Sequence, residues 1–177
     1  MTRTTFRIAA TLALLSTSQL QAAAPAPAKP CMTQVELRGM VAYVMPSAMS
    51  TLIDRCKSAL PAGASLLTRG AQLVTEFEGG RIAAFPMARQ AFAKFSDSGD
   101  KNATAIMLIV PEETLRPIVD DTVTQKLIGS IKAKDCPDID RVFATLEPLP
   151  ASNFIDLVTQ VVAIGARDDK QMSVCAA

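Results

Sequence analysis

The sequence predicts an all-α fold, a compact bundle of six or seven helices with a long first helix kinked at Pro46 and two disulfides. Apolar residues recur at helical spacing through most of the chain, and the four cysteines form an even set. Only residues 103–110 have the composition of a strand, and no other segment offers them a strand partner. A helical bundle is therefore the architecture that the pattern favours.

The N-terminus has the three parts of a secretory signal peptide. Arg3 and Arg7 form a basic start, residues 8–15 form a short apolar core, and residues 22–24 supply the small side chains that a signal peptidase accepts. The apolar core is shorter than the run of about 20 residues that a membrane span needs. We therefore predict that residues 1–24 are a signal peptide, cleaved within residues 22–24.

The rest of the chain is predicted to form one exported domain. Residues 25–30 alternate alanine and proline and are expected to be an extended tether, so the helical domain occupies residues 31–177. Without the two arginines of the leader, 16 basic residues face 17 acidic ones, a net charge of −1. The signal peptide predicts a periplasmic or extracellular protein. The charge balance, without a basic cluster, predicts that it binds no nucleic acid and does not insert stably into a membrane.

The four cysteines are predicted to form two structural disulfides. They are Cys31, Cys56, Cys136 and Cys175, and they lie far apart along the chain. A zinc site would need closely spaced cysteine pairs or histidines, and the sequence contains no histidine.

The pairing of these cysteines depends on the first helix. If residues 33–60 form one helix, Cys31 and Cys56 lie roughly 35 Å apart at 1.5 Å per residue, so each must pair with Cys136 or Cys175. If the chain instead turns back at its internal proline, Cys31–Cys56 and Cys136–Cys175 become the economical pairs. The apolar stripe keeps its phase across the proline, which favours the crossed pairs.

The helix boundaries follow from capping residues, glycines and prolines. Thr33 and Glu36 match a capping box at the start of the first helix. The further helices are expected at 65–78, ended by Gly79 and Gly80; from 82 or 86 to 95; at 103–110, short and buried; from 111 to 134 with a bend at Pro117; at 137–146; and from a Ser152 or Asn153 cap to 166.

The residue types argue against common catalytic machinery. Without histidine there is no Ser-His-Asp triad and no imidazole metal site. Carboxylates cluster at 112–113, 120–121, 135–140 and 168–169, but these positions are typical of helix caps and solvated faces. A carboxylate-based periplasmic hydrolase is kept as the alternative, and we expect no catalytic residues, metal site or cofactor.

Two methionines beside the proline are the candidate binding residues. Met45 and Met49 are four residues apart and share a helix face, where flexible thioethers suit a groove for an apolar guest. The same side chains also suit plain core packing, or Cu(I) binding together with Met40. Tyr43, nearby, is expected to be half-buried with its hydroxyl in water.

The sequence thus predicts an exported, non-catalytic helical domain with a binding or assembly role. The expected partner is an envelope protein or an apolar small molecule. The alternatives are the carboxylate-based hydrolase and methionine-based copper binding.

Overall fold

A computed structural model of the protein describes residues 31–96, 101–129, 131–166 and 174–175. Within these residues the chain forms six α-helices and one short 3-10 turn, which confirms the predicted all-α bundle. The elements are α1 (Gln34–Cys56), α2 (Ser65–Ser96), α3 (Lys101–Ile109), α4 (Glu112–Ile128), η1 (Ala133–Asp135), α5 (Cys136–Leu146) and α6 (Ala151–Gly165). The predicted signal peptide and tether lie outside the described residues.

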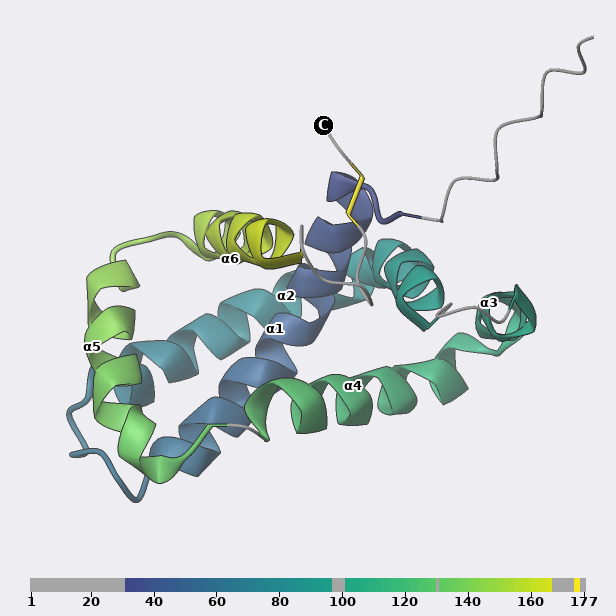
Figure 1. Ribbon diagram of the computed structural model, residues 1–177. Helices are drawn as coiled ribbons and strands as arrows, with labels where there is room; N and C mark the ends of the chain where they lie inside the picture. Colours follow the sequence, from purple (N-terminus) through teal and green to yellow (C-terminus); the bar gives the residue numbers. More distant parts are fainter. Residues whose placement is uncertain (1–30, 97–100, 130, 167–173, 176–177) are drawn as a thin grey trace, which may run out of the picture.

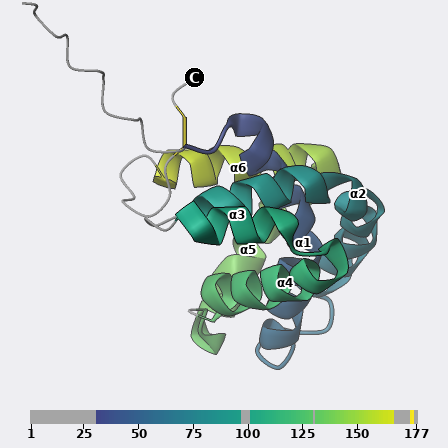
Figure 2. The same ribbon diagram turned by 90° about the vertical axis from the view of Figure 1, so that its right-hand side faces the viewer.

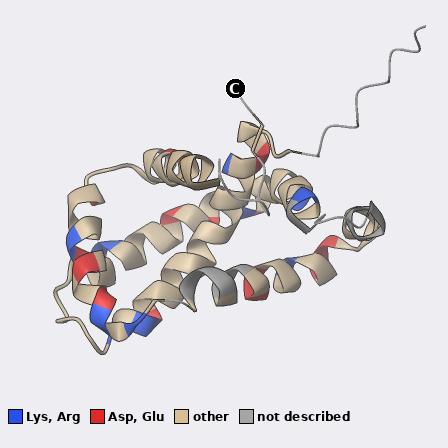
Figure 3. Cartoon of the chain, in the orientation of Figure 1, with Lys and Arg blue, Asp and Glu red and all other residues tan. Residues whose placement is uncertain are grey.

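The helices are arranged around the long pair α1 and α2, which pack side by side (Figure 1). α4 and α6 both lie against α1, whereas α3 and α5 contact α2 near its opposite ends. The view turned by 90° places α3 and α4 on the same side of the bundle (Figure 2). Lys and Arg are interspersed with Asp and Glu over the coloured helices (Figure 3).

The first helix begins and continues as the sequence predicts. The Glu36 backbone N–H donates to the Thr33 hydroxyl at 3.2 Å, and the Thr33 N–H donates to the Glu36 carboxylate at 2.7 Å, which completes the capping box. Pro46 lies inside α1 and does not end it. The in-phase apolar stripe therefore predicted one helix correctly.

The predicted break at Gly79 and Gly80 is wrong, because α2 continues through both residues. Each glycine costs a helix about 1 kcal/mol relative to alanine. The inward face of α2, which includes Leu73, Phe77 and Phe85, is buried against the rest of the bundle and outweighs that cost. The two expected short helices are thus one helix of 32 residues.

Two clusters of buried side chains form the core. The first joins α1 and α2 to α5 and α6 and consists of Val41, Met45, Met49, Cys56, Leu66, Leu73, Phe77, Cys136, Phe143 and Phe154. The second joins α1 and α2 to α4 and consists of Tyr43, Val44, Phe85, Ala88, Phe92, Leu115 and Val119.

The two disulfides confirm the crossed pairing and exclude the hairpin alternative. Cys31 is bonded to Cys175, and Cys56 to Cys136. The first bond ties the start of α1 to the chain end, where Met32 and Val174 also form a parallel bridge. The second joins the end of α1 to the start of α5 inside the core.

The helices of the second half differ from expectation in three places. Residues 103–110 do form a helix, but the buried position expected for it is wrong, because most of its large side chains are exposed. The helix expected to reach 134 ends at Ile128. α6 follows Pro150 without a side-chain cap, and the Ser152 hydroxyl bonds to the Asn153 side chain instead of to the backbone.

Among the described residues, no helix has both the length and the apolar character needed to cross a bilayer.

α1 and α2 approach each other closely at Gly39. A Cβ at this position would lie 2.4 Å from the Met87 Cβ, so Gly39→Ala must push the two helices apart. We expect this variant to lose about 1–3 kcal/mol of unfolding free energy. Gly79→Ala, where a Cβ meets no atom within 4 Å, is expected to gain about 0.5–1 kcal/mol. Chemical denaturation of both variants checks the pair, and equal shifts in one direction would contradict this packing.

Candidate functional site

The two methionines predicted to line a groove are buried in the core. Met45 and Met49 are 7% and 5% exposed and belong to the first core cluster, together with Leu66 and Phe77. This placement supports the alternative of plain core packing, and a guest could reach them only if the helices moved apart. Met40 packs against the second cluster instead, so the structure does not bring the three thioethers together.

Three of the carboxylates considered for hydrolysis are paired with basic side chains, and two others accept backbone N–H groups. Glu112 pairs with Arg116, Asp120 with Arg81, and Asp138 with Arg141. The Asp140 carboxylate accepts the Leu66 backbone N–H at 2.7 Å, and Asp135 accepts the Lys132 N–H at 3.0 Å. The Glu112 and Asp138 pairs lie within single helices, and the Asp135 bond caps the turn η1, in keeping with the predicted caps and solvated faces. The Asp120 and Asp140 bonds instead join two helices, which the sequence did not predict. Asp168 and Asp169 lie outside the described residues.

All four cysteines are oxidised, so no thiol is free. Across the described part of the chain, no three Cys, Asp or Glu side chains gather closely enough to hold a metal ion.

A polar cluster that the sequence did not reveal lies where α1, α2 and α4 meet. One terminal nitrogen of Arg81 donates to the Ser47 hydroxyl at 3.1 Å and to the Asp120 carboxylate at 2.5 Å. The other donates to Glu78 at 3.2 Å. Arg81 thus joins all three helices through one guanidinium, and its side chain is only 18% exposed.

Two aromatic rings of this cluster pack against each other in a tilted arrangement, and each contacts a guanidinium group. The Arg81 Cζ lies 4.9 Å from the Tyr43 ring centroid, and the Tyr43 and Phe85 centroids are 4.9 Å apart. The Arg116 Cζ lies 5.2 Å from the Phe85 ring centroid. Cation–π attraction therefore holds the arginines of α2 and α4 against the core.

Tyr43 is fully buried, at 0% exposure, so the expected half-buried position is wrong. Burial raises the pKa of Tyr43 above 10, and the Asp120 charge raises the pKa further against the opposing effect of Arg81 and Arg116. The phenol therefore stays protonated at neutral pH and remains a hydrogen-bond donor. Tyr43 is also the single tyrosine of the chain, which has no tryptophan.

Each of the three helices at this junction carries an internal proline. Pro46 is three residues after Tyr43, Pro86 follows Phe85, and Pro117 follows Arg116. A proline has no N–H, so each one leaves the carbonyl four residues earlier without its helical partner. The junction therefore holds backbone acceptors that ordinary helices would not offer.

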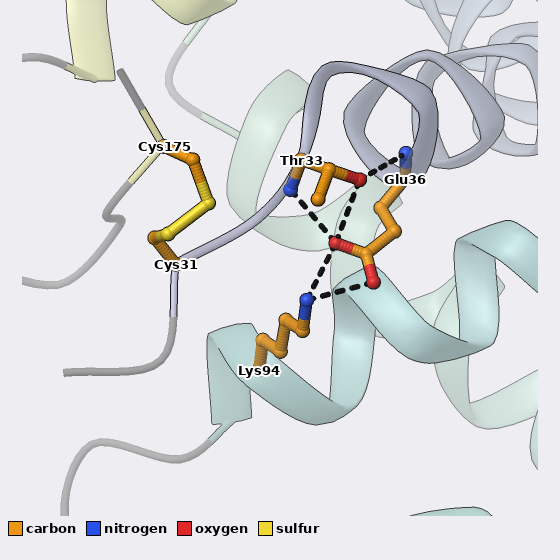
Figure 4. A network of polar contacts seen from close by, with 5 residues as sticks. All are labelled: Cys31, Thr33, Glu36, Lys94 and Cys175. Carbon is orange, nitrogen blue, oxygen red and sulfur yellow. Dashed lines mark hydrogen bonds and ion pairs between the residues drawn. A yellow bond between two sulfur atoms is a disulfide. The ribbon is translucent and has the colours of Figure 1, made fainter. Parts of the chain in front are cut away.

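A second polar network lies beside the Cys31–Cys175 disulfide (Figure 4). The Lys94 ammonium donates to both Glu36 carboxylate oxygens, at 2.6 and 2.7 Å, and Thr33 binds the same carboxylate. Burial alone would raise the pKa of Glu36, but the hydrogen bonds from Lys94 and Thr33 outweigh it and hold the pKa below 4.5. This network joins the start of α1 to the end of α2.

The Glu36 network makes a prediction for acid stability. Because the pKa of Glu36 is lowered in the folded protein, its ionised carboxylate contributes fully to the free energy of unfolding above pH 4.5. This contribution is lost as the pH falls through the pKa of Glu36 in the folded protein. Glu36→Gln is expected to lose about 1.5–3 kcal/mol of unfolding free energy at neutral pH. The difference from the unmodified protein should shrink as the pH falls below 4.5.

Denaturation at a series of pH values measures this difference, with Asp54→Asn as the matched control in the exposed pair with Lys57. The control is expected to change stability by less than about 1 kcal/mol. A Glu36→Gln deficit that stays constant down to pH 2 would contradict the assignment.

A group of large exposed aliphatic side chains, close together in the sequence, lies on α3. Ile106, Leu108 and Ile109 are 55%, 48% and 78% exposed, whereas Met107 packs against the second core cluster. Arg89 of α2 holds the end of this helix.

The Arg89 guanidinium donates to three backbone carbonyls at the end of α3. These bonds reach Met107 at 3.1 Å, Leu108 at 2.5 Å and Val110 at 2.7 Å. Such bonds satisfy carbonyls that a helix end leaves without partners. α3 is thereby fixed to α2 with its aliphatic side chains turned outward.

A search of known protein families, curated proteins and solved structures gave no significant match to this chain. The site must therefore be argued from its own geometry. The sequence did not indicate the pairing of Arg81 with Asp120, because 39 residues separate them and no local pattern connects them. One feature of the sequence could have suggested that these helices meet: each of the three contains an internal proline.

Proposed function

We propose that this chain is an exported helical domain with a binding or assembly role, and that it contacts a partner protein through α3. The signal-peptide pattern and the two disulfides support export, because disulfides persist in oxidising compartments. The observation that carries the binding role is the row of exposed aliphatic side chains at Ile106, Leu108 and Ile109.

The chemistry around α3 favours a protein as the partner. Small-molecule sites enclose most of their ligand in a concave pocket. These exposed side chains instead belong to a single helix, and that helix lies at the edge of the bundle (Figure 1). Glu113 follows α3, and the adjacent Glu112 is neutralised by its pair with Arg116, so the helix end offers no excess of basic charge to attract an anionic lipid surface. A protein with an apolar patch and a basic rim is therefore the complementary partner.

A second exposed aliphatic stripe, on α6, provides the comparison surface. It consists of Leu157, Val161 and Ile164, which share one face of the helix. We assign the partner to α3, whose three exposed aliphatic side chains lie within four residues of one another, and use the α6 stripe as a control.

The test compares two double variants of the mature, oxidised protein. Ile106→Asp/Ile109→Asp places charge on α3, and Val161→Asp/Ile164→Asp places the same charge on α6. Each immobilised protein is incubated with envelope extract from its own cells, and the recovered proteins are quantified by mass spectrometry. We expect one protein to be recovered by the unmodified chain and the α6 variant, and to be reduced at least about tenfold with the α3 variant.

Circular dichroism establishes that both variants remain folded. Equal recovery by all three proteins would contradict the assignment to α3. Sedimentation of the unmodified protein with vesicles of phosphatidylglycerol, abolished by the α3 variant, would replace the protein partner with a lipid surface.

A further inference from the structure

The two disulfides are nested, because the bond between the second and third cysteines lies inside the loop that the first and fourth close. The outer bond, Cys31–Cys175, has a sequence separation of 144, and the inner bond, Cys56–Cys136, has one of 80. A chain that joined its cysteines in the order of their appearance would instead pair the first with the second and the third with the fourth. The native pairing is therefore not the one that the order of the cysteines favours.

The wrong pairing of the first two cysteines also closes more readily in the unfolded chain. The entropic cost of bringing two residues together rises with the logarithm of their separation. Cys31 and Cys56 are only about 25 residues apart, so they meet about sixfold more often than the cysteines of the inner bond and about fourteenfold more often than those of the outer bond. A chain exported through an N-terminal signal peptide also presents these two cysteines to the oxidising compartment first.

Local structure does not hold the first two cysteines apart before the bundle forms. α1 contains Pro46, which removes one of its backbone hydrogen bonds. A helix also draws most of its stability in water from tertiary packing. The helix against which α1 packs is α2, which begins only at Ser65, after the second cysteine. The first two cysteines can therefore react before α1 becomes stable.

The folded protein cannot contain a bond between the first two cysteines. A disulfide needs Cα atoms within about 7 Å, and the continuous helix α1 separates Cys31 from Cys56 by roughly 35 Å. Cys175 and Cys136 lie at the same two ends of α1, because each is bonded to one of these cysteines. A chain with either wrong bond must therefore break that bond before the native bundle can form.

We propose that this protein is a folding substrate of a thiol–disulfide isomerase, an enzyme whose free thiolate rearranges disulfides without changing their number. The mispaired bonds arise when a disulfide oxidant takes two electrons and two protons from each pair of thiols and becomes a dithiol. The proposal rests on the proposed export, which brings the chain into contact with such an oxidant. It does not depend on the binding role of α3.

Three successive thiol exchanges convert the mispaired chain into the native one. The enzyme thiolate attacks the Cys56 sulfur, which forms a mixed disulfide and releases the Cys31 thiolate. Cys31 attacks Cys175, which forms the outer bond and releases the Cys136 thiolate. Cys136 then attacks the mixed disulfide at Cys56, which forms the inner bond and restores the enzyme thiolate. The chain has two disulfides before and after, so these exchanges consume neither oxidant nor reductant.

Burial makes the native pairing the end point of these exchanges. Cys56 and Cys136 are fully buried, so a thiolate of another protein cannot reach the inner bond once the bundle has formed. The outer bond is partly exposed, but Met32 and Val174 pair beside it and hold its two cysteines together. Mispaired chains have no such core and stay open to attack.

Oxidative refolding of the mature protein tests the proposal. The reduced protein is diluted from denaturant into diamide, which oxidises thiols and supplies no thiol of its own, with or without a purified thiol–disulfide isomerase. Peptide mapping after an acid quench identifies the bonds. Without the isomerase, we expect peptides that link Cys31 to Cys56 to exceed those that link Cys56 to Cys136 about sixfold. Added isomerase should raise the yield of the native pairing at least about fivefold.

Two outcomes of this refolding would overturn the proposal. One is a chain that forms mainly the two native bonds in diamide alone. The other is a mispaired chain that the isomerase does not convert. The refolding takes place outside the cell and reads which cysteines are joined, so its outcome is distinct from that of the export test, which reads the mature N-terminus.

The matched control is Cys31→Ala/Cys175→Ala, because its single pair of cysteines cannot mispair. Its Cys56–Cys136 bond should form to the same extent with and without the isomerase, within about twofold. A control that gains as much from the isomerase as the unmodified protein would show a general folding aid instead of disulfide exchange, and would overturn the proposal.

Discussion

Replacing Cys56 and Cys136 together by alanine is expected to destabilise the protein more than any other change considered. The disulfide closes a loop with a sequence separation of 80 residues, which corresponds to about 4–5 kcal/mol of chain entropy in the unfolded state. Both cysteines are fully buried in the first core cluster, so the alanines also leave their sulfur positions unfilled. The measurement is the free energy of unfolding in denaturant under non-reducing conditions.

The matched comparison is Cys31→Ala/Cys175→Ala. This bond closes a longer loop, but both of its cysteines are partly exposed at the end of the bundle. We expect it to cost less than the buried pair, because its removal opens no cavity in the core. A larger loss for Cys31→Ala/Cys175→Ala would contradict the role assigned to the Cys56–Cys136 bond.

Met45→Ala and Met49→Ala are each expected to lower the free energy of unfolding by about 2–5 kcal/mol. Both side chains are buried in the first core cluster, so each truncation removes core contacts and leaves a cavity. The two positions are one turn apart, and their effects should not add simply. Denaturation of the single variants and of the double variant gives the three values.

The same variants decide between core packing and the groove predicted from the sequence. If the methionines are core, folded Met45→Ala/Met49→Ala should recover the same envelope protein as the unmodified chain. A nearly unchanged melting temperature with loss of that protein would instead restore the groove and contradict the buried placement.

The sequence predicted helices correctly where the interactions that form them lie between residues close together in the chain. The stripe that stayed in phase across Pro46 predicted one continuous helix, and the length of that helix then excluded a Cys31–Cys56 bond. The capping box of Thr33 and Glu36 formed as predicted. In each case the deciding interactions lie within a few residues along the chain, or follow directly from helix geometry.

The failures arose where tertiary contacts decided the outcome. Gly79 and Gly80 favour a break, but the packing of α2 against its neighbours carries the helix through them. The apolar composition of 103–110 suggested burial, whereas only one side of α3 reaches α2. Composition reports how apolar a segment is, and not which surface covers it.

The candidate polar site was beyond local reasoning for the same reason. Arg81 and Asp120 meet across 39 residues of chain, and Glu36 and Lys94 across 58. Neither pair has a spacing that marks it in the sequence. Met45 and Met49, by contrast, stand out in the sequence because a spacing of four residues places them on one helix face. The same spacing occurs in side chains that pack in a core, so it does not distinguish a groove from core packing.

Mass spectrometry of the protein purified from its own cell envelope tests the central claim of an exported, doubly cross-linked domain most directly. Intact mass should show cleavage within residues 22–24 and no free thiol. Non-reducing peptide mapping should then recover Cys31 linked to Cys175 and Cys56 linked to Cys136. A mature chain that retains Met1, or peptides that link Cys31 to Cys56, would contradict the account.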